Sequence, residues 1–112
     1  MNRGIGHAAE GEFEVALKDL DSALEVEPGM PAALYNRGNV NLDLSNNEAA
    51  IRDFSDVIQA EPRFALAWLN RGLAREQAGD LEGAQRDLEQ ALVLDKSLQP
   101  ARRALARIKK DR

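Results

Sequence analysis

The sequence repeats itself with a fixed spacing of 34 residues. The tripeptide Asn-Arg-Gly occurs three times, beginning at Asn2, Asn36 and Asn70. Other positions keep the same offset: Ala16, Ala50 and Ala84; Asp19, Asp53 and Asp87; Leu20, Phe54 and Leu88; Leu24, Ile58 and Leu92. A fixed period of this size is typical of a repeat array, in which one supersecondary unit stacks on the next. The 112 residues therefore predict about three units of a single domain.

Within each period the apolar residues recur at three- and four-residue steps, which predicts amphipathic helices. No stretch alternates with a period of two, so we expect no sheet. Proline, glycine and asparagine separate the helices. The first predicted helix covers residues 1–10 and ends in a turn at Gly11-Glu12. The next helix runs from Phe13 to before Pro28. The remaining predicted helices are 31–44, a helix between Asn47 and Pro62, 64–78, 81–95 and 98–110. Asn46 or Asn47 is the expected N-cap of the helix before Pro62.

With these residues the chain resembles the tetratricopeptide repeat (TPR) family. The matching residues are Gly4, Ala16, Leu20, Ala23 and Pro28 in the first unit, Leu34, Gly38, Ala50, Phe54 and Pro62 in the second, and Trp68, Gly72, Ala84, Leu88 and Ala91 in the third. The resemblance implies an all-α, right-handed superhelical array over residues 1–112. Its three helix–turn–helix units are 1–30, 31–64 and 65–97, closed by a capping helix at 98–110. Lys96 and Val57 depart from the family pattern, and the first unit lacks its opening turn.

Two repeated features predict how the helices of one unit pack. Glycine inside a helix costs about 1 kcal/mol relative to alanine, so three in-phase glycines indicate close helix approach. We expect the repeated alanines, such as Ala50, to face them. The arginines precede the repeated aspartates by 16 residues, which predicts bridges from Arg3, Arg37 and Arg71 to Asp19, Asp53 and Asp87. The alternative is that the arginines bind a ligand, but the aspartates repeat with them and favour the structural interpretation.

Composition argues against a catalytic or metal site. The chain has no cysteine and one histidine, His7, and a metal site needs several converging ligands. It has no glycine-rich phosphate loop and no clustered Ser/His/Asp set. We therefore expect no enzyme activity, no metal and no cofactor. No apolar run approaches the ~20 residues of a membrane span, and no signal peptide is visible, so we expect a cytoplasmic protein without a membrane partner.

The TPR resemblance implies that the first helix of each unit lines a concave groove that binds a peptide or protein segment. The implied lining residues are Asn2, Ile5, Tyr35, Asn36, Asn39, Leu42, Leu66, Leu69, Asn70 and Leu73, with Arg103 and Arg107 closing one end. An asparagine amide offers donors and an acceptor, which suits the backbone of an extended peptide. The alternative is that these asparagines only satisfy neighbouring groups of the fold. We expect a non-catalytic scaffold or adaptor.

One TPR subtype holds the acidic C-termini of chaperones through lysine, asparagine and arginine side chains. The corresponding residues here are Met1, Ile5, Asn36, Leu66 and Asn70, of which only Asn36 agrees, so we do not expect a chaperone-tail receptor. Residues 98–112 carry a charge of +5 and the remainder −9, without basic–aromatic interleaving, so we expect no nucleic-acid partner. The alternative function is structural: the clipped first unit predicts a section of a longer array, or a spacer that forms a weak homodimer.

Overall fold

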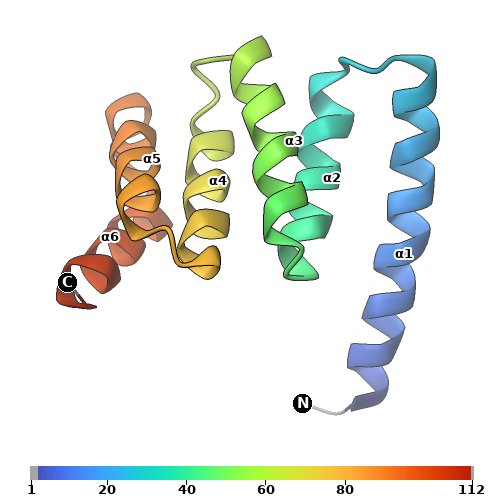
Figure 1. Cartoon of the computed structure of the whole chain (residues 1–112), viewed down its shortest axis with the longest axis horizontal. Coiled ribbons are helices and arrows are strands. Elements are labelled where there is room, and N and C mark those ends of the chain that lie inside the picture. The colour runs from blue at the N-terminus through green and yellow to red at the C-terminus, as the bar shows by residue number, and fades with distance from the viewer. Residues whose placement is uncertain (1–2, 112) are drawn as a thin grey trace.

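Between residues 3 and 111, six α-helices lie side by side in chain order in the computed structural model of the protein (Figure 1). The structure describes the backbone of residues 3–111 and the side chains of residues 11–110. The helices are α1 Arg3–Val26, α2 Pro31–Asp43, α3 Asn47–Ala60, α4 Ala65–Ala78, α5 Leu81–Leu94 and α6 Gln99–Asp111. No strand occurs within 3–111. The predicted all-α repeat array is confirmed.

The helix ends follow the residues that interrupt the apolar pattern. Pro31 opens α2, where its missing N–H removes no helical hydrogen bond. Gly79 closes α4 in the left-handed region, with φ 93°, which glycine adopts without a steric penalty. The Asp80 carboxylate then caps α5 by accepting a hydrogen bond from the Gly83 N–H at 2.9 Å. Asn46 stands at the N-cap of α3 as predicted, but its amide donates to Asn41 instead of capping the helix.

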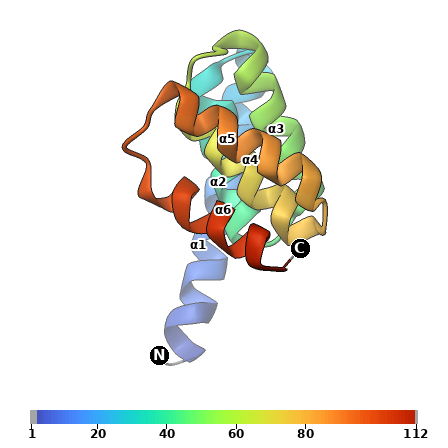
Figure 2. The same cartoon turned by 90° about the vertical axis from the view of Figure 1, so that its left-hand side faces the viewer.

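The predicted turn at Gly11-Glu12 is wrong, because α1 runs through it as one helix of 24 residues. The N-terminal part of α1 projects beyond the neighbouring helices (Figures 1 and 2). The sequence around Gly11 contains no proline and is rich in alanine and glutamate, which favour a helix. A single glycine costs only about 1 kcal/mol there, too little to end the helix.

Replacing Gly11 with alanine should therefore stabilise the protein. Nothing lies within 4 Å of a Cβ added at Gly11, and the residue is exposed, so the change improves helix propensity without a clash. We expect the free energy of unfolding to rise by about 0.5–1 kcal/mol. Chemical denaturation followed by circular dichroism measures this. A decrease in stability would show that residue 11 needs a non-helical backbone, as in a turn.

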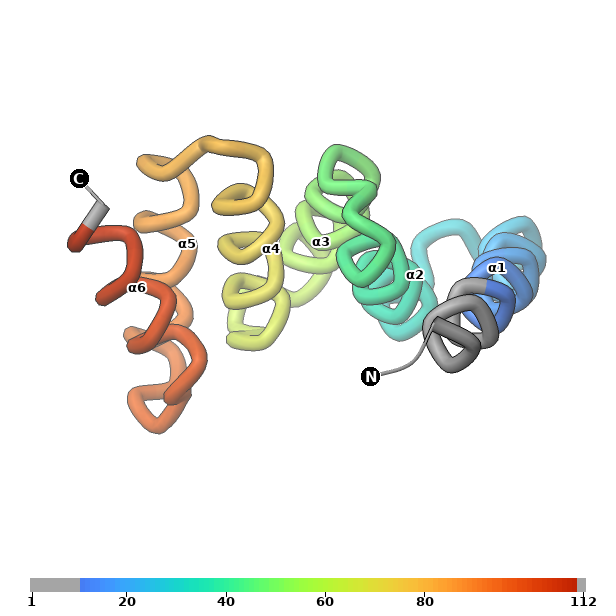
Figure 3. The backbone as a smooth tube through the Cα atoms, turned by 90° about the horizontal axis from the view of Figure 1, so that it is seen from below, coloured from blue at the N-terminus to red at the C-terminus, as the bar shows by residue number. Residues whose placement is uncertain are grey.

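Among the described side chains, the buried apolar residues form three clusters along the row of helices, which Figure 3 shows from below. Phe54, Val57 and Leu88 are fully buried on the inner faces of α3 and α5. The amphipathic helix α6 covers α5 with Ala101, Ala104 and Ile108 and turns its basic side chains outward. That this helix caps the array stays a prediction.

The repeated glycines lie where two helices approach closely, but the residues that face them are not the expected alanines. A Cβ on Gly38 would lie 2.7 Å from the ring of Phe54, and one on Gly72 would lie 2.9 Å from Leu88 Cγ. The large apolar residue 16 positions later thus faces each glycine, and the expected contact with Ala50 or Ala84 is not the closest one. The alanines are fully buried all the same.

Candidate functional site

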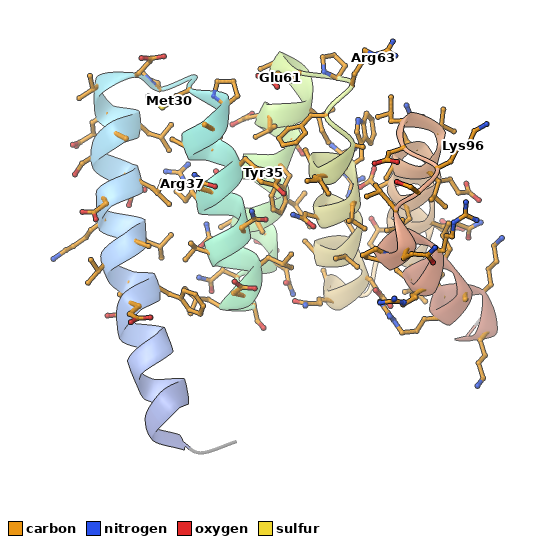
Figure 4. All side chains as sticks on the ribbon, turned by 180° about the vertical axis from the view of Figure 1, so that it is seen from behind. Met30, Tyr35, Arg37, Glu61, Arg63 and Lys96 are labelled. Atoms are coloured by element: carbon orange, nitrogen blue, oxygen red, sulfur yellow. The ribbon has the colours of Figure 1, made fainter. Side chains whose placement is uncertain are left out.

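The predicted arginine–aspartate bridge joins the two helices of the second unit. Arg37 on α2 donates from Nε and Nη2 to the carboxylate of Asp53 on α3, at 3.0 and 2.8 Å. Its Nη1 donates to Asp21 on α1 at 2.8 Å, so Arg37 lies between α1 and α2 (Figure 4). These hydrogen bonds, above all those to Asp53, raise the pKa of Arg37 above its ordinary value. Asp53 is buried and also accepts from the Asn41 amide.

The third unit repeats this arrangement. Arg71 donates to both oxygens of Asp87 at 2.9 and 2.8 Å, and Arg75 adds a bond of 2.9 Å to the same carboxylate. Arg71 also reaches back to Ser55 on α3 at 3.1 Å. Two of the three predicted bridges are thus confirmed, and Arg37 and Arg71 also tie their units to the preceding one. The Arg3 side chain, predicted to pair with Asp19, lies outside the described side chains.

A hollow of about 630 Å³ is lined by residues of α2, α4 and α6 and by Ser45. Its lining residues are Leu42, Asp43, Ser45, Leu73, Glu76, Gln77 and Arg107. Three predicted groove residues, Leu42, Leu73 and Arg107, are among them. Arg107 donates from Nε and Nη2 to Glu76, both at 2.7 Å, which fixes α6 against α4 at the rim of the hollow.

A second, smaller hollow of about 220 Å³ lies at the other end of α2. Tyr35 and Asn36 line it, together with Phe64 from the connection between α3 and α4. Tyr35 points across toward α4 (Figure 4), and its ring centroid lies 4.8 Å from that of Phe64. Asn36 is exposed, and no hydrogen bond to its amide occurs within the described side chains.

Two of the predicted asparagines bind each other between the hollows. The Asn70 amide donates to Asn39 Oδ1 at 2.7 Å and to the Tyr35 hydroxyl at 3.2 Å. Both hydrogens of this amide thus serve the packing of α2 against α4, and only its oxygen remains for another molecule. Asn39 and Asn70 therefore fit the alternative in which the asparagines satisfy neighbouring groups of the fold. Asn36 makes no such hydrogen bond within the described side chains.

The other predicted lining residues divide into exposed and buried ones. Leu66 and Arg103 are exposed. Leu69 is 4% exposed and packs in the core with Leu88 and Leu105, so the expectation that it lines an open groove is wrong. The packing of α6 onto α4 and α5 covers it. Asn2 lies outside the described residues, and the side chain of Ile5 lies outside the described side chains.

Sequence reasoning missed four residues of the larger hollow. These are Asp43, Ser45, Glu76 and Gln77. Helical spacing could have found two of them, because residues three and four positions after Leu73 share its helix face. Within the described residues, no group of three or more His, Cys, Asp or Glu is placed to hold a metal ion. Residues 3–111 also contain no helix that is long and apolar enough to cross a membrane.

Comparison with solved structures finds close similarity over almost the whole chain. The first TPR of Spaghetti (RPAP3) bound to an HSP90 peptide superposes with a TM-score of 0.87 at 23% identity, covering 97% of this chain and 86% of that one. The second TPR domain of human RPAP3, in complex with the HSP70 peptide SGPTIEEVD, gives 0.83 at 28% identity, covering 96% and 89%. MamA from Desulfovibrio magneticus gives 0.86 at 27% identity, and this chain spans 62% of it.

The sequence itself matches a family model. A search of curated protein sequences finds no match. The model described as tetratricopeptide repeat, however, matches residues 1–54 and again residues 38–101. Together these matches cover most of the chain. The chain belongs to the tetratricopeptide repeat family.

Proposed function

We propose that the chain is a non-catalytic interaction module that binds an extended peptide along the face formed by α2, α4 and α6. The observation that carries the proposal is the 630 Å³ hollow at this face, where Leu42 and Leu73 border polar groups. Ligand sites commonly combine an apolar lining with a few polar groups. A human TPR domain 28% identical to this chain is described in complex with a peptide, which supports a ligand of the same kind.

The residues of the face favour a peptide with an apolar side chain. Leu42 and Leu73 offer the larger hollow to that side chain. The Asn36 amide lies near the smaller hollow without a partner among the described side chains, and it can both donate to and accept from a peptide bond. The Asn70 oxygen offers a further acceptor between the two. We infer that the peptide crosses from Asn36 to Leu73 and contacts both hollows.

An acidic C-terminal tail suits this face less well. The HSP70 peptide bound by the human RPAP3 domain ends in Glu-Glu-Val-Asp. At the positions where the chaperone-binding subtype carries cations, this chain has leucine at Leu66 and asparagine at Asn70. Arg107 is already held by Glu76 in two hydrogen bonds. We therefore propose a ligand that is recognised through its backbone and an apolar side chain, and not through a terminal carboxylate.

The test begins with peptides selected by the wild-type protein from a displayed random library. We expect the double variant Asn36→Ala, Gln77→Ala to bind a selected synthetic peptide about thirtyfold more weakly, because each of the two lost hydrogen bonds is worth about 1 kcal/mol. Fluorescence anisotropy measures the dissociation constant. Both residues are exposed, so the fold is retained.

The matched control is Gln59→Ala, an exposed residue that borders a different hollow with Pro28 and Leu34. It should leave the affinity unchanged. Peptide SGPTIEEVD should bind more weakly than the selected peptide. Equal affinity of the wild type and the double variant would place the ligand elsewhere and reject the proposal.

A further inference from the structure

The charged side chains of the larger hollow do not balance. Besides the two leucines, its lining contains Asp43, Glu76 and Arg107. Arg107 donates to both oxygens of Glu76 at 2.7 Å, so these two charges largely cancel each other. Asp43 makes no hydrogen bond and no ion pair within the described side chains. One negative charge at the hollow therefore stays without a counterpart there.

The ends of two helices add to this negative charge. α2 ends at Asp43 and α4 at Ala78, and both ends lie on the same side of the molecule (Figure 1). The C-terminal end of a helix carries about half a negative charge, because its last carbonyl groups have no helical partner. The last turn of α2 contains no basic residue, and Arg75 in the last turn of α4 is bound to Asp87 at 2.9 Å. The hollow is therefore a favourable place for a cation.

The fold gains nothing from the carboxylate of Asp43. An acidic side chain at the C-terminus of a helix is unfavourable, because it meets the negative end of the helix dipole. The 34-residue repeat has Gln77 at the matching position, so an acidic residue there is not part of the repeated framework. Asp43 is also exposed. Its carboxylate is therefore accessible to a positively charged group of a bound molecule.

We propose that the peptide bound at this face carries a basic residue, lysine or arginine, beside its apolar one. Its charged end meets Asp43 and its aliphatic stem lies along Leu42 and Leu73, as long basic side chains commonly do. The inference rests on the proposed binding face. Sites of several hundred Å³ hold ligands of many atoms, so a hollow of about 630 Å³ has room for both side chains. Ser45 and Gln77, which also line it, offer oxygen acceptors to the remaining N–H groups.

The peptides that the wild-type protein selects from a displayed random library give the first test. They should be enriched in lysine or arginine next to an apolar residue. Asp43→Asn should bind a selected peptide about fivefold more weakly by fluorescence anisotropy, as expected for the loss of one exposed ion pair. Replacing the basic residue of the peptide with norleucine, which keeps the stem without the charge, should weaken binding to the wild type by the same factor. Asp43→Asn should bind the two peptides equally, since it already lacks the pair.

A charge exchange and a matched control separate this ion pair from general attraction between a basic peptide and an acidic protein. Asp43→Lys should bind a peptide with glutamate at the basic position more tightly than the wild type does. Asp56→Asn removes an exposed carboxylate that borders a different hollow and should leave the affinity unchanged. The melting temperature of Asp43→Asn should stay the same or rise, because the change removes a negative charge from a helix C-terminus. A weaker affinity of this variant then cannot come from a damaged fold.

The outcomes distinguish a failure of this inference from a failure of the binding face. Selected peptides without a basic residue, or equal affinities of the wild type and Asp43→Asn, would overturn the inference. The binding face would still stand if Asn36→Ala, Gln77→Ala bound these peptides more weakly. A library that yields no binder, or a double variant with wild-type affinity, would reject the face itself and this inference with it.

Discussion

Replacing Asp87 with alanine is expected to lower the free energy of unfolding by about 3–5 kcal/mol, the range measured when one partner of a buried ion pair is removed. Asp87 is 2% exposed and accepts three hydrogen bonds, two from Arg71 and one from Arg75. Without the carboxylate, two guanidinium groups face each other across a cavity that holds no negative charge. Urea denaturation followed by circular dichroism measures the change.

The matched control is Asp56→Ala on α3, at an exposed position. Its effect should stay within about 0.5 kcal/mol, as for most surface substitutions. Asp53→Ala should lie between the two, because the second unit places the neutral Asn41 where the third places Arg75. If Asp87→Ala cost no more than the control, the bridge would not hold α4 to α5.

The array could be predicted from the sequence because its signals recur in register. The Arg37–Asp53 and Arg71–Asp87 bridges follow from two residue types that keep one offset across three units. The donor that completes each bridge was missed, since asparagine stands at position 41 and arginine at position 75. A position whose residue type changes between units cannot be found by searching for residues that repeat.

The errors arose where the outcome depended on a neighbouring element. Gly11 is a turn residue by local chemistry, but its flanking helix formers carry α1 through it. Leu69 shares a helix with Leu73, yet α6 covers the first and leaves the second at the hollow. Periodicity places residues on a helix face, but only the packing of the other helices decides how much of that face stays open.

Gly38→Leu is expected to lower the free energy of unfolding by about 1–3 kcal/mol through overpacking. The added Cβ alone would lie 2.7 Å from Phe54 Cε1 and 2.9 Å from Cδ1 and Cζ. The Phe54 ring is fully buried and packs against Tyr35, with ring centroids 5.9 Å apart, so it has no free space to enter. α2 must move away from α3, which loosens the Arg37–Asp53 bridge as well.

A double-mutant cycle with Phe54→Ala separates this clash from a general loss of helix packing. Phe54→Ala alone should cost about 3–5 kcal/mol by leaving a cavity. In the double variant the new leucine fills part of that cavity, so the two costs should sum to more than the measured loss by at least about 1 kcal/mol. Gly11→Leu, at an exposed helical glycine, is the matched control and should not destabilise the dilute protein. Strictly additive costs would mean that residue 38 and the ring do not touch, and that glycine is required there for another reason.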